Sequence, residues 1–172
     1  RDGERPLTPR GRARFRLAAR GLARIADRPD VLLTSPLVRA RATAEIAAAA
    51  FKKVTPRVEP ALGQENVDAV VAALRKCPRD AMVAVVGHEP TLSRLVARML
   101  GVHQDDDRFA FKKGGAALLD LPDGPAAAGQ LRWFVKPGIL RSLGGAFMLD
   151  PATIAAGQEL GLEFPVSYGL GR

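Results

Sequence analysis

The sequence has little cysteine, few aromatic residues and no long apolar runs, and each shortage excludes a class of protein. One cysteine, Cys77, among 172 residues excludes an internal disulfide framework and gives no metal cluster. No apolar run is long enough to cross a bilayer and no secretory signal is visible, so we expect a cytoplasmic protein without a membrane partner. Aromatic residues make up 5% of the chain and do not alternate with basic residues, which disfavours base stacking on nucleic acid.

The formal net charge of +8 has two interpretations. It could attract anionic partners, including nucleic acid or phosphorylated molecules. It could instead reflect arginines on solvated helix faces. The residues after Pro9 favour the second interpretation, because arginines recur every four positions while Phe15, Ala18, Leu22 and Ile25 hold another face. We therefore expect no nucleic-acid partner from these arginines, which are Arg12, Arg16, Arg20 and Arg24.

The pattern of apolar residues predicts one α/β domain. Thr8 is a candidate N-cap and Pro9 a candidate first helical residue. Helices are expected over 9–27, 37–51, 66–77 and 91–101, and strands over 31–34, 57–62, 83–86, 114–121 and 130–135. Strands that alternate with helices predict a three-layer α/β/α sandwich with a mostly parallel sheet. The last two strands should form a hairpin that supplies an antiparallel edge. Residues 145–172 have no clear period and are expected to be a tail or linker.

Polar residues follow two of the predicted strands. "TSPLVRARAT" follows the strand at 31–34, and "GHEPTLS" follows the strand at 83–86. Because sites in open α/β sheets form at the carboxyl ends of strands, Arg39 or Arg41 would meet His88 if these strands are close. Arginine and helix N-termini bind phosphoryl oxygens well, and imidazole can bond them or move a proton near neutral pH. Taken singly, a histidine after a strand is more often a structural residue, and an arginine in the first turn of a helix is more often solvated.

At these residues the sequence resembles a known family. "RPLTPRG", "LLTSPLVRARAT", "VAVVGHEPTLSRLVARMLG", "FKKGGAALLDL" and "LRWFVKPGILRSLG" occur in the order and spacing of the SixA-type phosphohistidine phosphatases, in the histidine phosphatase (phosphoglycerate mutase-like) superfamily. The resemblance covers residues 2 to about 144, so a phosphatase domain is expected over 1–144. It implies a phosphatase without metal or cofactor that acts on phosphohistidine, or on a small phosphorylated compound, through a phosphohistidine enzyme intermediate.

The resemblance also implies roles for individual residues. In the family, a histidine in an N-terminal Arg-His-Gly motif attacks phosphorus, while two arginines and a second histidine hold the phosphoryl oxygens. Carried over by position, Arg39 is the second arginine and His88 the second histidine. Arg5 is a further candidate for phosphate binding. Arg41 lies two residues after Arg39 and is expected to face elsewhere.

The sequence departs from the family pattern in its catalytic residues. It contains no Arg-His-Gly, and its other histidine, His103, fits no catalytic segment. We therefore expect an N-terminally truncated, inactive fragment that lacks the first strand and the nucleophile. Glu59 and Glu65 are the nearest candidates for a general acid, and neither matches well. Glu89 is interpreted as an acid that complements a helix N-terminus.

Several alternatives remain open. A sugar-phosphate or nucleotide phosphatase of the same superfamily would use the same residues. A non-catalytic module could keep Arg39 and His88 to recognise a phosphoryl group. Lys112 and Lys113 could help to recruit an anionic substrate, or could belong to a solvated turn. The sequence leaves the substrate, a phosphorylated protein or small molecule, and the oligomeric state undecided.

Overall fold

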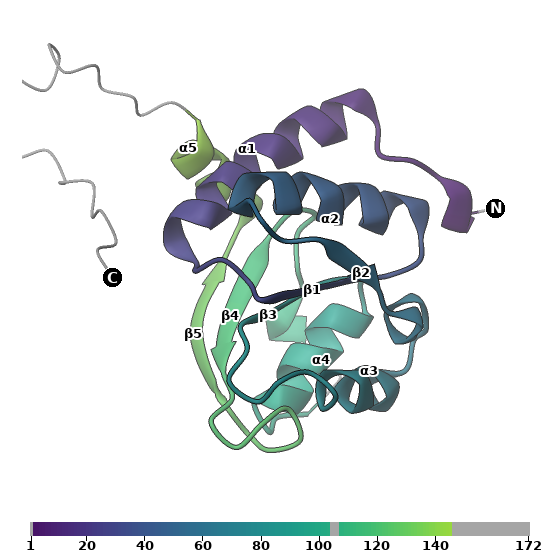
Figure 1. Cartoon of the computed structure of the whole chain (residues 1–172), viewed down its shortest axis with the longest axis vertical. Coiled ribbons are helices and arrows are strands. Elements are labelled where there is room, and N and C mark those ends of the chain that lie inside the picture. Colours follow the sequence, from purple (N-terminus) through teal and green to yellow (C-terminus); the bar gives the residue numbers. More distant parts are fainter. Residues whose placement is uncertain (1, 104–106, 146–172) are drawn as a thin grey trace, which may run out of the picture.

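A layer of three parallel strands forms the centre of the chain in the computed structural model, which describes residues 2–103 and 107–145. β1 (Val31–Thr34) lies between β2 (Pro56–Val58) and β3 (Val83–Val86) and pairs with both. Figure 1 shows helices α1 and α2 on one side of this layer and helices α3 and α4 on the other. The expected α/β fold class is therefore confirmed.

The helices begin where local sequence favours them. Thr8 Oγ1 accepts a hydrogen bond from Gly11 N at 3.0 Å, so the expected N-cap of the first helix is confirmed. Asn66 Oδ1 accepts one from Ala69 N at 3.0 Å and caps the helix expected from residue 66. Among the described residues, none of the helices is long and apolar enough to cross a membrane. The helices are α1 (Pro9–Ile25), α2 (Val38–Phe51), α3 (Val67–Leu74), α4 (Thr91–Met99) and α5 (Pro137–Gly144), with short 3-10 turns η1 (Asp2–Glu4), η2 (Pro60–Gly63) and η3 (Asp107–Phe109).

The two faces of the sheet carry separate parts of the core. Leu33 is 1% exposed and packs in a cluster with residues of η2, α3 and α4. Its neighbour Leu32 is 2% exposed and packs on the opposite face, against Ala44 and Ala48 of α2. Successive strand residues point to opposite faces, so a strand that is buried on both sides needs a continuous apolar run. This requirement explains the sequence of β1.

The C-terminal hairpin differs in placement from the expectation. β4 (Ala116–Asp120) and β5 (Gln130–Val135) pair in antiparallel fashion, as predicted. In the described part of the chain they form a sheet of their own and do not hydrogen-bond to β3. The hairpin is therefore not an edge of the parallel sheet. It meets the core through side chains instead, because Leu119 and Leu121 pack against the cluster around Leu33.

The sequence pattern also missed α5, which is stabilised by a close contact with α1. A Cβ atom on Gly21 would overlap the carbonyl oxygen of Leu140, and one on Gly144 would overlap that of Leu17. The two helix backbones therefore approach each other at a pair of glycines. The guanidinium of Arg24 donates to the carbonyl oxygen of Leu143 and so satisfies an acceptor in the last turn of α5. This contact explains a helix of only eight residues that begins with Pro-Gly.

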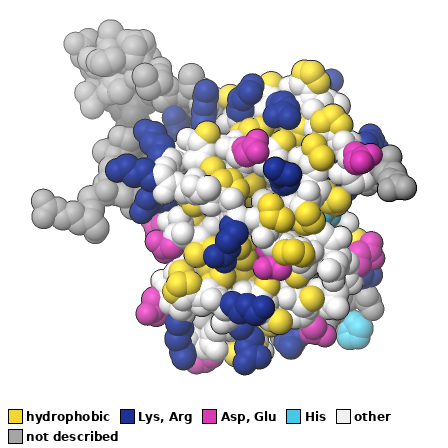
Figure 2. All heavy atoms as spheres, turned by 45° about the vertical axis from the view of Figure 1, so that its right-hand side comes forward, with side chains coloured by type: hydrophobic (Ala, Val, Ile, Leu, Met, Phe, Trp, Pro, Cys, Tyr) yellow, Lys and Arg dark blue, Asp and Glu magenta, His cyan; other side chains and the backbone are white. Residues whose placement is uncertain are grey.

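The surface agrees in most respects with the amphipathic pattern expected for the first helix. Arg16, Arg20 and Arg24 are exposed, whereas Ala18 is buried. The helix ends at Ile25 instead of residue 27, and Ile25 itself is 36% exposed, so the apolar face is not fully covered at its last residue. On the face in Figure 2, basic side chains are dispersed among acidic and apolar ones. The tail expected over residues 145–172 lies, apart from Gly145, outside the described residues.

The contact between α1 and α5 predicts opposite effects for two glycine substitutions. Gly21→Ala should lower the free energy of unfolding by roughly 2 kcal/mol, because the added methyl group meets backbone that cannot move aside cheaply. Gly138→Ala is the matched control in α5, since a Cβ there comes near only the flexible side chain of Arg141, and it should be neutral or stabilising by up to about 1 kcal/mol. Urea unfolding measures both. Equal stability of the two variants would contradict the proposed contact.

Candidate functional site

Two strands that are far apart in the sequence end side by side. β1 and β3 pair in register, with Thr34 opposite Val86, the last residue of each strand. The backbone N–H of Ser35 then donates to the carbonyl oxygen of Val86 at 2.9 Å. The turns that follow both strands are therefore held together at one edge of the sheet. This is the edge at which the sequence placed its candidate residues.

His88 lies at this edge and is bound to a serine from the other turn. His88 Nε2 and Ser35 Oγ are 2.8 Å apart, and Ser35 is 0% exposed. His88 is half-buried, between that serine and the surface. Sequence reasoning had not included Ser35 among the site residues. The sequence feature that could have indicated Ser35 is its place between a buried strand and a proline. A hydroxyl buried there needs a hydrogen-bond partner.

Arg39 is placed at the same edge by the start of α2. Leu37 is the N-cap residue of α2, so Arg39 lies in the first helical turn, four residues after Ser35. Arg39 is half-buried and Arg41 is exposed. The carbonyl oxygen of Arg39 accepts a hydrogen bond from Thr43 Oγ1 at 2.8 Å, which stabilises this first turn. The assignment of Arg39 and His88 to a phosphoryl group remains a prediction.

The N-termini of two helices reach this edge. Neither α2 nor α4 has a side-chain hydrogen bond at its N-cap residue, Leu37 or Pro90. The first N–H groups of a helix carry a partial positive charge and bind anions readily. Combined with the guanidinium of Arg39, the two helix ends favour a negatively charged ligand at this edge.

Glu89 holds the loop after His88 in place. Its Oε2 accepts from Ser93 Oγ at 2.6 Å, and its Oε1 accepts from the backbone N–H of Phe111 at 3.2 Å. Ser93 belongs to α4, so this carboxylate complements the helix N-terminus as expected and also ties it to the segment before β4. Lys112 and Lys113 follow Phe111 directly and are exposed, so both lie close to the loop that carries His88.

The N-terminal segment passes beside the start of α2. A Cβ on Gly3 would lie 3.0 Å from Leu37 Cδ2, so η1 packs next to the N-cap of α2. Arg5 follows two residues later and is exposed. Its part in phosphate binding remains a prediction.

The two candidate general acids differ in position. Glu59 follows β2, and its N–H donates to the carbonyl oxygen of Thr34 at 2.9 Å, which brings it to the same edge. Its Oε1 accepts from Ala61 N at 3.1 Å and so caps η2. Glu65 is exposed and lines a neighbouring groove. The structure thus brings Glu59, and not Glu65, to the end of β1.

His103 is not brought to His88. The two histidines flank α4, with His88 before its first turn and His103 after its last. A helix of nine residues is about 13 Å long, so the imidazoles belong to opposite ends of it. The expectation that His103 lies outside the catalytic segments is consistent with this separation.

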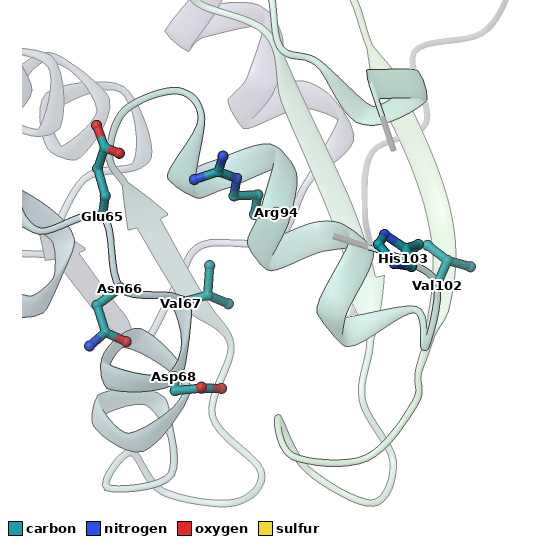
Figure 3. A pocket seen from close by; sticks show the side chains of 7 residues that line it. All are labelled: Glu65, Asn66, Val67, Asp68, Arg94, Val102 and His103. Carbon is teal, nitrogen blue, oxygen red and sulfur yellow. The ribbon is translucent and has the colours of Figure 1, made fainter. Parts of the chain in front are cut away.

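An open, polar groove of about 670 Å³ lies between the start of α3 and the side of α4 (Figure 3). Arg94 extends from α4 toward the segment that carries Glu65 and Asp68. The groove adjoins the edge described above, because Thr91 Oγ1, in the first turn of α4, donates to the carbonyl oxygen of Gln64 at 3.4 Å. Its lining residues are Glu65, Asn66, Val67, Asp68, Arg94, Val102 and His103.

The described residues offer no evident metal centre. Over residues 2–103 and 107–145, no three side chains of histidine, cysteine, aspartate or glutamate gather in a way that could hold an ion. Cys77 is a half-buried free thiol that packs against the core, as a structural cysteine does.

Known proteins are similar to this chain in sequence. The profile of the histidine phosphatase superfamily (branch 1) matches residues 1–65. A protein of Picosynechococcus sp. is 37% identical over 128 residues, which span 73% of this chain and 76% of that protein.

Solved structures of SixA proteins are similar along most of the chain. The structure of the protein histidine phosphatase SixA complexed with tungstate is similar to this chain with a TM-score of 0.69 and 27% identity. The match covers 81% of this chain and 89% of that one. A SixA from Nakamurella multipartitia, assigned as a phosphohistidine phosphatase, gives 0.64 at 28% identity and covers 80% and 87%. The chain therefore belongs to the histidine phosphatase superfamily, and within it to the phosphatases that resemble SixA.

Proposed function

We propose that this protein acts on phosphohistidine in a polypeptide, and that Arg39 and His88 bind the transferred phosphoryl group. The observation that carries the proposal is the joined edge of β1 and β3, where His88 meets Ser35 at the start of α2. Two SixA structures of similar fold, described as histidine phosphatases, support the same substrate class.

The chemistry of this edge suits a phosphoryl group. Arg39 offers a planar fork of N–H donors that matches phosphate oxygens, and its charge is permanent. The helix ends add backbone N–H groups without further charge. His88 adds a ring N–H donor. Such fixed donors stabilise the charge that builds up on a phosphoryl group during transfer.

Turnover needs more than these donors in the two-histidine mechanism that the resemblance implies. That mechanism requires an attacking imidazole beside the phosphoryl-binding one. The other histidine of this sequence, His103, lies at the far end of α4 from His88. We therefore expect residues 1–172 by themselves to bind a phosphoryl group without hydrolysing it.

The groove next to the edge favours a polypeptide over a sugar phosphate or nucleotide. Sites for small molecules are usually concave, mostly apolar and largely enclosed. This groove is open and lined by charges of both signs, with Glu65 and Asp68 on one side and Arg94 on the other. Arg94 lies in the first turn of α4, which begins three residues after His88, so a few residues of extended peptide can bridge the two.

The first prediction concerns phosphoryl binding. Arg39→Ala should weaken the binding of inorganic phosphate to residues 1–172 roughly tenfold, because a charged hydrogen-bond donor is lost. Arg41→Ala is the matched control, since Arg41 is exposed on the same helix, and it should leave the affinity unchanged. Isothermal titration at low salt measures both variants.

Two results would contradict this proposal. Equal losses in the Arg39→Ala and Arg41→Ala variants would indicate a general effect of charge. Hydrolysis of a phosphohistidine peptide by residues 1–172 that His88→Ala abolishes would show that one imidazole at this edge suffices, against the expectation above.

The second prediction concerns the groove. Stable phosphohistidine-analogue peptides with acidic flanking residues should bind less tightly, by roughly three- to tenfold, after Arg94→Glu, because the charge that faces them is reversed. Peptides with basic flanks should gain, and inorganic phosphate should be unaffected. Arg75→Glu is the control, since Arg75 is exposed at the end of α3 and does not line the groove. Identical responses to Arg94→Glu and Arg75→Glu would rule the groove out as the peptide site.

A further inference from the structure

The hydroxyl of Ser35 has two hydrogen-bond partners among the described residues, and together they determine where its proton goes. Leu37 N donates to Ser35 Oγ at 3.3 Å, and His88 Nε2 lies 2.8 Å from the same oxygen. The backbone N–H of Leu37 can only donate, so it occupies a lone pair of the hydroxyl. Among the described residues, the hydroxyl hydrogen then has a single acceptor, which is Nε2 of His88.

The burial of Ser35 makes this assignment matter energetically. Ser35 is 0% exposed, so no bulk solvent can accept its hydrogen. If His88 carried its proton on Nε2, that proton and the hydroxyl hydrogen of Ser35 would point at each other. Otherwise the hydroxyl would rotate away and leave its hydrogen without an acceptor. A buried donor without an acceptor costs more than an ordinary hydrogen bond gains. The arrangement therefore favours an unprotonated Nε2.

We propose that Ser35 is a positioning residue that holds His88 as the neutral tautomer with its proton on Nδ1. The hydroxyl of Ser35 donates to Nε2, and the imidazole proton resides on Nδ1. His88 is then a hydrogen-bond donor through Nδ1 without needing a positive charge. What this tautomer means for a phosphoryl ligand rests on the proposed function. The assignment of the tautomer itself does not depend on that function.

The surroundings of Ser35 are rigid enough for this role. Its backbone N–H is bonded to Val86 at the end of β3, and Pro36 follows it directly. A Cβ on Gly63 would lie 2.8 Å from Pro36 Cγ, so η2 packs closely against this proline. The backbone that carries the hydroxyl is thereby held by the sheet on one side and by η2 on the other. A fixed donor selects one tautomer of its partner far better than a mobile one.

The tautomer can be measured directly on the unaltered chain. Nitrogen-15 NMR of residues 1–172, at a pH where the ring of His88 is neutral, distinguishes a protonated from an unprotonated ring nitrogen. We expect the Nδ1–H form of His88 to exceed the other by about tenfold or more. A majority of the Nε2–H form in the unaltered chain would overturn the proposal without any variant.

Substitutions separate positioning from structural support. Ser35→Ala should shift His88 toward a mixture of tautomers while the signals of the exposed His103 stay in place. Ser35→Thr restores a hydroxyl and should restore the Nδ1–H form. Ser142→Ala, which removes an exposed hydroxyl bonded to Gly138, is the matched control and should change neither histidine. An unchanged tautomer in a folded Ser35→Ala variant would overturn the proposal.

Phosphate titration separates this inference from the proposed function. If the Nδ1–H tautomer is found and inorganic phosphate also binds, Ser35→Ala should weaken that binding by roughly three- to tenfold. If the tautomer is found and phosphate does not bind, the role of Ser35 stands and the proposed phosphoryl site fails. If phosphate binds with the Nε2–H tautomer, the proposed site stands and the role of Ser35 fails.

Discussion

The parallel pairing of β1 with β3 is the constraint on which both the core and the candidate site depend. In this register Leu33 faces one cluster of the core and Leu32 the other, and Thr34 lies opposite Val86. A slip of one residue would turn every strand side chain to the wrong face. The same slip would separate Ser35 from His88. The hydrophobic effect that fixes the register therefore also fixes the polar contact at its end.

Carboxylates near this edge bond to the backbone and to a neighbouring hydroxyl. Glu59 caps η2 through Ala61 N, and Glu89 ties the loop after β3 to Ser93 and to the segment before β4. Each of them satisfies donors that would otherwise be left over where regular structure ends. Their negative charge is thus directed at N–H and O–H groups of the turns. This use of acids is compatible with the anion site that we propose at Arg39 and the two helix ends.

The sequence predicted local features well and long-range ones poorly. The strands at 31–34 and 83–86 and the cap at Thr8 depend on neighbouring residues only, and all were found. The role of Ser35 depends on which two strands are neighbours, which no local pattern states. Helix α5 likewise depends on a glycine pair contributed by α1, and the hairpin on side-chain packing with the core. His88 was recognisable because a Gly-His pair directly followed an apolar run.

The contrast between the two parts of the candidate site bears on where selectivity arises. The edge at His88 is built from a half-buried imidazole, a half-buried arginine and helix ends, none of which distinguishes one phosphorylated molecule from another. Discrimination must then come from contacts beyond the phosphoryl group. The groove along α4 provides side chains of both signs there: Glu65 and Asp68 are exposed and Arg94 is half-buried. Changes in the groove could therefore alter the preferred partner while β1, β3 and the bond between Ser35 and His88 stay as they are.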